Sequence, residues 1–175
     1  MASLYTPSIT NEQLLASKNL RHKKINLDYE YTSGFPYDNV GVLKNINWNT
    51  IAFTKQNVAA IRNTQGIYMF TFNPYSFSMS NHQAEIILYI GQAKDLQVRL
   101  TKYFAYPNST KASDQERRFM VLFFSDFLRI NFLETNNLSQ TDLDNLEYGL
   151  IDSILPPYNL KVHSEFAQAY RRILN

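Results

Sequence analysis

The chain has 175 residues, of which 45% are hydrophobic and 14% aromatic, so it can bury one substantial core without disulfides or metals to hold it together. Cysteine is absent, which excludes thiolate zinc sites, cysteine nucleophiles and a disulfide framework. The net charge of +2 is too small to indicate a polyanionic partner, so only local clusters of charge can do so.

The start of the chain and its apolar runs argue against a membrane protein. Residues 1–18 lack the basic-then-apolar order of a signal peptide, and no apolar run approaches the roughly 20 residues that cross a bilayer. We therefore expect a soluble cytoplasmic protein with no membrane partner.

The first 60 residues show the least regular pattern. Residues 11–19 are a modest helical candidate, and residues 21–24 form a basic cluster that either contacts phosphates or is ordinary solvated surface. A short helix capped by Thr54 is predicted over residues 54–62. We expect residues 1–60 to be an N-terminal extension that joins the core or forms a dimer or DNA surface.

Two segments rich in aromatic and β-branched residues follow. Residues 66–72 and 85–90 are both predicted to be strands. The polar segment between them predicts a long loop, so the two strands are expected to form a hairpin. His82 in this loop has no second ligand at metal spacing, and a zinc site is therefore not expected.

Two helices are predicted next. Over residues 94–105, Leu96, Leu100 and Phe104 recur at four-residue spacing, as on the apolar face of a helix, and Pro107 is expected to end it. Residues 114–127 are predicted to form the second helix.

The last part of the chain predicts a strand and a helix. Residues 128–134 alternate as a strand does, and Ser139 with an acidic residue three positions later resembles a capping box, opening a helix that ends at the prolines 156–157. With no internal repeat, this order predicts an α+β fold, a small central antiparallel β-sheet with flanking helices. We place the domain at residues 61–162 and a C-terminal tail at residues 163–175.

Two triplets and two charged residues stand out within this predicted fold. Residues 66–68 are Gly-Ile-Tyr and residues 89–91 are Tyr-Ile-Gly, while Arg99 lies in the helix that follows and Glu147 in the last helix. In this order and spacing they resemble the GIY-YIG nuclease superfamily. Retention of all four principal side chains argues against the alternative, a catalytically silent module that binds nucleic acid or protein on the same fold.

The resemblance extends beyond the triplets that give the family its name. Residues 89–103 closely resemble the nuclease domain of the bacterial excision-repair incision subunit, and the segment from Glu147 to Asn159 looks like the family's closing helix and tail. The resemblance implies a metal-dependent DNA endonuclease that leaves 5′-phosphate and 3′-hydroxyl ends. We expect a restriction- or defence-type enzyme, for which a homodimer would explain cuts in both strands.

The resemblance assigns the first tyrosine, Tyr68, to water activation and the second, Tyr89, to the phosphate. Core packing is the ordinary role of a strand tyrosine, and the family pattern overrides it. Since a free phenol has a pKa near 10, Tyr68 would need a nearby cation to favour its phenolate at neutral pH.

An arginine and a tyrosine four residues apart share one helix face, and both are candidate catalytic residues. Arg99 offers fixed donors to two non-bridging phosphate oxygens, where charge accumulates during displacement, and Tyr103 lies one turn further on. A solvated surface arginine is the alternative.

The helical carboxylate Glu147 borders an apolar stripe, which suits a metal ligand. A single carboxylate with phosphate oxygens and waters is a typical way to hold Mg²⁺, or Mn²⁺ in its place. Asp142 and Asp144 look instead like acidic residues of a first helical turn, favoured there by the helix dipole, and Asp152 is a further competitor.

Four further residues are candidate substrate contacts: Gly91, Lys94, Lys102 and Asn159. Gly91 is expected at a strand end where a phosphate can approach the backbone closely, and structural capping is the equal alternative for Asn159. Gln92 departs from the pattern, because the repair-subunit branch usually has a lysine there, and Lys94 or Lys102 would have to supply the missing charge.

Overall fold

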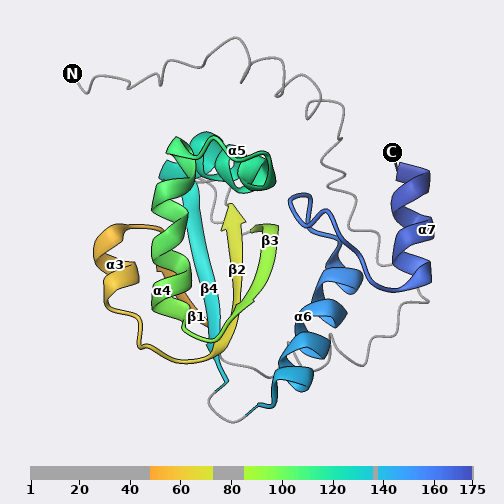
Figure 1. Ribbon diagram of the computed structural model, residues 1–175, viewed down its shortest axis with the longest axis horizontal. Helices are drawn as coiled ribbons and strands as arrows, with labels where there is room; N and C mark the ends of the chain where they lie inside the picture. The colour runs from red at the N-terminus through yellow and green to blue at the C-terminus, as the bar shows by residue number, and fades with distance from the viewer. Residues whose placement is uncertain (1–47, 73–84, 136–137, 175) are drawn as a thin grey trace.

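The computed structural model describes residues 48–72, 85–135 and 138–174. In chain order the elements are β1 (Asn49–Ala52), α3 (Lys55–Ala59), β2 (Gly66–Phe72), β3 (Ile86–Ala93), α4 (Leu96–Thr101), α5 (Gln115–Phe124), β4 (Leu128–Glu134), α6 (Gln140–Ile154) and α7 (Glu165–Leu174) (Figure 1). The predicted helix at residues 11–19, the basic residues 21–24 and His82 lie outside the described residues.

The sheet has four strands in the order β1-β4-β2-β3, and every neighbouring pair is antiparallel. This confirms the predicted small antiparallel sheet with flanking helices. β2 and β4 begin and end at the predicted residues, and β2 pairs with β3 as the predicted hairpin. β1 and α3 fall within residues 1–60, so part of the expected N-terminal extension belongs to the sheet and its covering layer.

β3 is longer than predicted and runs to Ala93. The prediction that Gly91 lies at a strand end is therefore wrong, because Gly91 is an interior residue of β3 that pairs with Tyr68. Gly66 does begin β2, as predicted, where a Cβ would collide with the backbone carbonyl of Leu133 on the neighbouring strand.

The first long predicted helix is α-helical over a shorter range than expected. Asp95 caps α4, and its side chain accepts a hydrogen bond from the Val98 amide at 2.8 Å. From Lys102 to Asn108 the chain continues as a 3-10 helix that contains Pro107, so the proline does not end the helical path. Residues three apart are aligned in a 3-10 helix, and this alignment places the Tyr103 and Tyr106 rings together, edge to face, with centroids 5.0 Å apart.

The other helices follow the prediction more closely. α5 is extended by a 3-10 turn from Ser125 to Phe127, which completes the predicted range. Ser139 caps α6 as predicted, accepting a hydrogen bond from the Asp142 amide, and α6 ends in a left-handed residue, Leu155, just before the two prolines. In the part of the chain that the structure describes, no helix is long and apolar enough to cross a membrane.

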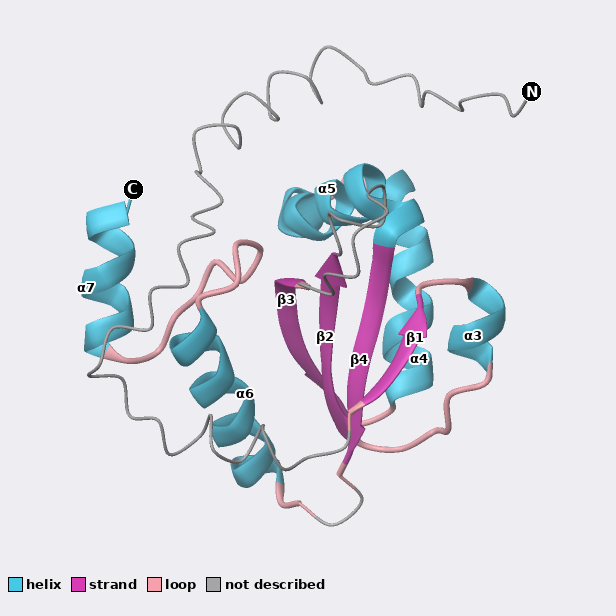
Figure 2. Cartoon of the chain, turned by 180° about the vertical axis from the view of Figure 1, so that it is seen from behind, coloured by secondary structure: helices cyan, strands magenta, loops and turns pink. Residues whose placement is uncertain are grey.

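The sheet separates two hydrophobic clusters, and β2 contributes to both. Its residues Tyr68 and Phe70 belong to the cluster under α3, α4 and α5, whereas Ile67 and Met69 belong to the cluster under α6. Figure 2 shows α4 across one face of the sheet and α6 beside β3. Because side chains alternate along a strand, all seven residues of β2 are buried or half-buried.

Candidate active site

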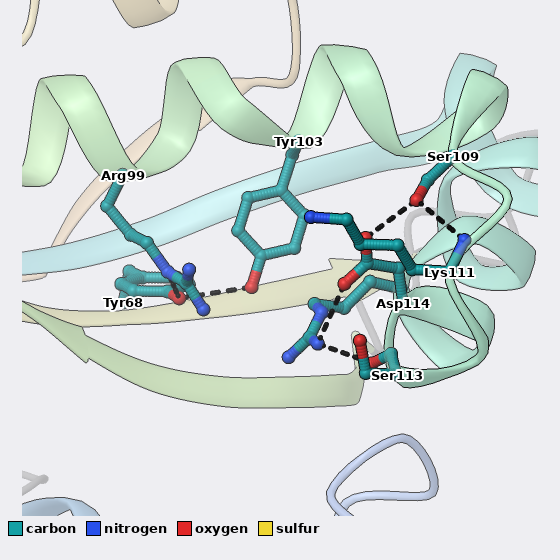
Figure 3. Close-up of polar contacts among 8 residues, drawn as sticks. Tyr68, Arg99, Tyr103, Ser109, Lys111, Ser113 and Asp114 are labelled. Carbon is teal, nitrogen blue, oxygen red and sulfur yellow. Dashed lines mark hydrogen bonds and ion pairs between the residues drawn. The ribbon is translucent and has the colours of Figure 1, made fainter.

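Three of the predicted catalytic side chains are in direct contact on the α4 face of the sheet. The Tyr68 hydroxyl accepts a hydrogen bond from Nε of Arg99 at 3.0 Å and lies 3.0 Å from the Tyr103 hydroxyl (Figure 3). The Arg99 guanidinium carbon also lies 5.6 Å from the centre of the Tyr103 ring. β2 and the α4 segment thus bring together residues that are 31 and 35 positions apart.

Gly91 makes this arrangement possible. A Cβ at this position would lie 2.5 Å from the Tyr68 hydroxyl oxygen and 2.9 Å from the Tyr89 ring. The phenol of the first triplet therefore occupies the space left by the glycine of the second. Gly91 is buried under this ring, so the structure gives it a packing role and does not support the predicted contact with a phosphate.

Burial dominates the electrostatics of the Tyr68 phenol. The side chain has no exposed surface, and this burial together with Tyr89 raises its pKa, although Arg99 and the Tyr103 hydrogen bond act in the opposite direction. The cation that a phenolate would need is present, but the loss of hydration outweighs it. Tyr68 is therefore a neutral phenol at neutral pH, and the Tyr103 pKa is likewise raised by burial.

Arg99 remains a cation in this setting. Burial by itself would lower the pKa of the guanidinium, but Tyr68, Tyr103 and Tyr106 raise it by a larger combined amount. Arg99 is only half-buried, so the residue keeps some contact with solvent. A fixed, partly exposed cation of this kind can bind an anionic oxygen.

Tyr89 lies at the margin of the same cluster. Its ring centre is 6.2 Å from those of both Tyr68 and Tyr103, and its side chain is half-buried. The register pairs Tyr89 with Phe70, two pairs along from the Tyr68–Gly91 pair and so on the same face of the sheet. Of the two triplet tyrosines, Tyr89 is the one with exposed surface.

Arg117 on α5 is a charged residue near this cluster that the sequence analysis missed. Its guanidinium carbon lies 5.2 Å from the centre of the Tyr106 ring. Burial alone would lower the Arg117 pKa, but Tyr106, Tyr89 and Tyr103 raise it above its ordinary value. Two adjacent arginines within the predicted helix 114–127 were the available signal, but only the tertiary structure brings one of them to the tyrosines.

Glu147 lies on the other face of the sheet, in contact with β3 through Gln92. Nε2 of Gln92 donates to Oε2 of Glu147 at 2.9 Å and also to Oδ1 of Asp144, and Gln140 donates to the same Asp144 oxygen. Burial raises the pKa of the Glu147 carboxyl, the Gln92 hydrogen bonds lower it, and the Asp144 charge raises it further. The net pKa is above the ordinary value.

Asp144 is closer to this carboxylate than the sequence suggested. The sequence analysis interpreted it as an acidic residue of the first helical turn, but its side chain shares the Gln92 amide with Glu147. The Gln92 and Gln140 hydrogen bonds lower the Asp144 pKa. Within residues 48–72, 85–135 and 138–174, no group of three or more His, Cys, Asp or Glu side chains is placed to hold a metal.

The predicted site residues therefore occupy two faces that meet at the edge strand β3. Side chains alternate along β3, so Tyr89 and Gly91 face the tyrosine cluster, whereas Ile90 and Gln92 face α6. Convergence of all four principal side chains on one phosphorus atom was the sequence prediction. The structure brings three of them into contact and places Glu147 across the strand edge.

Asn159 serves the backbone of this edge strand. Its amide accepts from the Ile90 N–H and donates to the Ile90 carbonyl, both at 2.8 Å, and the neighbouring Tyr158 N–H donates to the Leu88 carbonyl. The Asn159 side chain is buried. These bonds support the structural alternative and not the predicted substrate contact.

The two lysines expected to contact substrate both lie on the surface. Lys94 follows β3 and its charge lowers the pKa of Asp144, which places it toward the α6 side. Lys102 directly follows α4 and is exposed. Their roles as phosphate contacts stay predictions.

A known protein family matches the part of the chain that carries most of these site residues. The model of the UvrC-like GIY-YIG domain matches residues 73–160, just over half of the chain. The chain belongs to the GIY-YIG nuclease superfamily. The matched range of this GIY-YIG domain includes the second triplet, the helix of Arg99, Glu147 and Asn159, and begins just after the first triplet.

Similar curated proteins are much longer than this chain. It is 33% identical over 100 residues to UvrABC system protein C of Vibrio cholerae (strain M66-2), covering 57% of this chain and 15% of that protein. It is 36% identical over 74 residues to UvrABC system protein C of the Wolbachia of Brugia malayi, covering 42% and 11%. The chain thus corresponds to a small part of these relatives.

Among solved structures, the chain is similar to the GIY-YIG N-terminal endonuclease domain of UvrC from Thermotoga maritima bound to its catalytic divalent cation, magnesium. The sequence identity is 21% and the TM-score is 0.42. The alignment covers 61% of this chain and 94% of that domain.

Proposed function

We propose that this GIY-YIG domain is a metal-dependent DNA endonuclease. The observation that carries the proposal is the hydrogen bond from Arg99 to Tyr68, which fixes a half-buried cation beside the first-triplet tyrosine in a member of a nuclease superfamily. Hydrolysis joins a water oxygen to phosphorus and breaks the P–O3′ bond, leaving a 5′-phosphate and a 3′-hydroxyl.

The roles of the tyrosines follow from their burial. Arg99 and Tyr89 have exposed surface, so we assign them to the phosphate, where the guanidinium stabilises the charge that develops during displacement. Tyr68 and Tyr103 are fully buried neutral phenols, so they position Arg99 and do not themselves activate water. We propose this positioning role for Tyr68 in place of the water activation that the sequence resemblance implies, and that role stays a prediction.

Glu147 and Asp144 fit a divalent metal. Their oxygens accept hydrogen bonds from one Gln92 nitrogen, so the two carboxylates lie close together at the edge of β3. Mg²⁺ is commonly held by one or two carboxylates with substrate oxygens and waters, and Mn²⁺ accepts the same ligands. The bound metal would stabilise negative charge on the phosphate and on the departing 3′ oxygen.

The geometry of β3 lets one DNA strand meet both groups. Residues 158–159 cover the edge of β3 at Leu88 and Ile90, which leaves the cationic and acidic side chains adjacent to the next two residues, Gly91 and Gln92. A phosphodiester lying across this end of the strand would face Arg99 on one side and Glu147 on the other. In this proposal the two groups act on one phosphate around the strand edge.

The relatives also bear on the biological role of the proposed enzyme. The restriction- or defence-type role predicted from the sequence gains no support from the relatives reported above, which are proteins of the UvrABC system. We therefore favour a DNA-processing enzyme related to the repair nuclease domain. A homodimer, a cytoplasmic location and the domain boundary at residue 61 stay predictions, although β1 and α3 pack with the rest of the domain.

A nicking assay tests the proposed function. Purified protein is incubated with supercoiled plasmid in Mg²⁺, with EDTA as the metal-free control. Glu147→Ala should slow nicking by on the order of 10²- to 10⁴-fold, the range observed when a charge-stabilising group is lost. Glu165→Ala, which removes an exposed carboxylate at the start of α7, is the matched control and should nick at the parental rate.

The same assay separates the rival function, a silent binding module. Binding to DNA without nicking under any divalent metal, by a folded parent protein, would favour that module over the nuclease. Nicking by Glu147→Ala at the parental rate would show that the metal assignment is wrong.

A further inference from the structure

Two arginines flank a pair of tyrosines along one side of the α4 face. Arg99 lies over the Tyr103 ring, Tyr103 packs edge to face with Tyr106, and Arg117 lies over the Tyr106 ring. The corresponding separations are 5.6, 5.0 and 5.2 Å. The sequence places Arg117 in a different helix from Arg99, and the aromatic pair between them fixes their spacing.

Contacts with the start of α5 anchor one nitrogen of the Arg117 guanidinium but leave another without a partner among the described residues. Nη2 donates to the Ser113 carbonyl at 2.6 Å and lies 3.3 Å from Oδ1 of Asp114. Nε is buried, and no hydrogen-bond partner for it lies within the described part of the chain. Such a side chain has lost rotamer freedom before any ligand binds, which lowers the entropic cost of binding an anion.

Two carboxylates and two guanidiniums lie on opposite sides of β3. Asp144 and Glu147 gather on the α6 side, whereas Arg99 and Arg117 gather on the tyrosine side. A DNA strand carries one phosphate per roughly 3.4 Å of helix axis, so a strand that presents one phosphate to Arg99 presents the next a short distance away. Two guanidiniums held apart by a pair of rings can therefore contact two different phosphates of one strand.

We propose that Arg117 binds a backbone phosphate that flanks the scissile one on the same DNA strand and sets the register of that strand against Arg99. The inference rests on the proposed nuclease function and adds a substrate-binding residue to it. Arg117 supplies affinity and register, and Arg99 acts at the reacting phosphate.

A purely structural role is the rival explanation, since the Ser113 and Asp114 contacts also fasten the start of α5. Three variants separate the two roles. Arg117→Gln removes the charge, Asp114→Asn weakens the anchor but keeps the arginine, and Arg118→Gln is the matched control. Arg118 is the adjacent arginine, its Nη1 donates to the Ser109 carbonyl at 2.7 Å, and its guanidinium lies over the Phe119 ring.

The first measurement is binding of a labelled DNA duplex in EDTA at several salt concentrations. Removing one phosphate contact lowers the slope of log K against log salt by about 0.9 and weakens binding roughly tenfold at low salt. We expect this for Arg117→Gln, with a raised KM and a nearly unchanged kcat in the nicking assay. Asp114→Asn and Arg118→Gln should keep the parental slope, and Arg117→Lys should restore most of it.

An unchanged salt slope for Arg117→Gln would overturn the inference, as would an equal loss in Asp114→Asn, which would show that the anchor of α5 is what matters. Thermal unfolding of each variant checks that it is folded. A parent protein that nicks DNA while Arg117→Gln behaves identically contradicts this inference alone. A folded parent protein that neither binds nor nicks DNA contradicts the proposed function, and the inference with it.

Discussion

The Tyr68 hydroxyl illustrates how burial decides a chemical role at the scale of one residue. A cation is bonded to it at 3.0 Å, yet its pKa is raised, because loss of hydration disfavours the phenolate more than Arg99 favours it. A neutral phenol can accept the hydrogen bond from Arg99 and also form one with the Tyr103 hydroxyl. Its contribution is therefore the orientation of the guanidinium.

Tyr68→Phe tests this role. A hydrogen bond to a charged group contributes about 1.5 to 3 kcal/mol, so loss of the hydroxyl should slow single-turnover nicking by roughly 10- to 100-fold. Tyr158→Phe, which alters a half-buried phenol packed on the same cluster, is the control and should stay near the parental rate. A Tyr68→Phe enzyme as fast as its parent would show that the hydroxyl does not orient Arg99.

Glu147 is the residue whose charge opposes folding. Its folded pKa lies above the ordinary value of 4.5, mainly because of burial, so between those two pKa values the native state binds more protons than the unfolded state. The free energy of unfolding therefore falls as pH rises through that window. The Glu147→Gln variant has no carboxyl group at this position, so its free energy of unfolding does not fall for this reason.

The Glu147→Gln prediction concerns thermal stability in EDTA. The variant should gain in Tm relative to the parent as pH is raised from 4 to 8, since only the parent must bury a carboxylate. Mg²⁺ at the upper pH should then raise the Tm of the parent and leave the variant unchanged, because the metal binds the native carboxylate. A Tm difference that is the same at both pH values would contradict the assignment of the shift.

At the scale of elements, the edge strand β3 depends on the segment that follows α6. Edge strands have unpaired backbone groups, and Asn159 satisfies both groups of Ile90 from a side chain. The left-handed Leu155 ends α6 and redirects the chain toward this edge. The asparagine at the end of the motif thus holds the strand that carries the second triplet.

Asn159→Ala should destabilise the protein by about 2 to 4 kcal/mol, because it leaves a buried N–H and a buried carbonyl unsatisfied. The measurement is urea unfolding, with Leu160→Ala as a control at an exposed neighbour that should change stability by less than about 0.5 kcal/mol. At a temperature where the variant stays folded, its DNA affinity should equal that of the parent. A loss of affinity in the folded variant would favour the substrate contact predicted from the sequence.

At the scale of the whole molecule, β2 joins the two hydrophobic clusters. Phe70 lies in the α4 cluster, and Leu150 lies in the α6 cluster where Trp48, the single tryptophan, also packs. Consecutive residues of one central strand support both clusters, so neither can lose its packing while β2 stays in place. The two clusters should therefore unfold together.

Phe70→Ala tests this coupling, because the tryptophan reports on the opposite cluster. The variant should lose about 3 to 5 kcal/mol and shift the Trp48 fluorescence transition in urea as far as the circular dichroism transition. Leu150→Ala, with an expected loss of about 2 to 5 kcal/mol, is the counterpart within the tryptophan's own cluster. A Phe70→Ala protein whose fluorescence transition stays at the parental midpoint would show two independent units.

Local pattern determined the strands, the cap and the order of elements. β2 and β4 were predicted to the residue because aromatic and alternating residues are specific to strands, and Ser139 was predicted as a cap from its own side chain. The two triplets, with Arg99 and Glu147, also predicted the superfamily. The strands and the cap depend on neighbours along the chain, and the superfamily depends on residue types that occur in a fixed order.

Only the tertiary structure decided which groups meet. The burial that keeps Tyr68 neutral, the approach of Arg117 from α5 and the clamp of Asn159 on Ile90 all join residues that are far apart in sequence. The separation of Gly91 and Gln92 onto two faces depends on the register of β3, since a shift of one residue would exchange those faces. Hydration and register are properties of the packed sheet, and a linear pattern does not specify them.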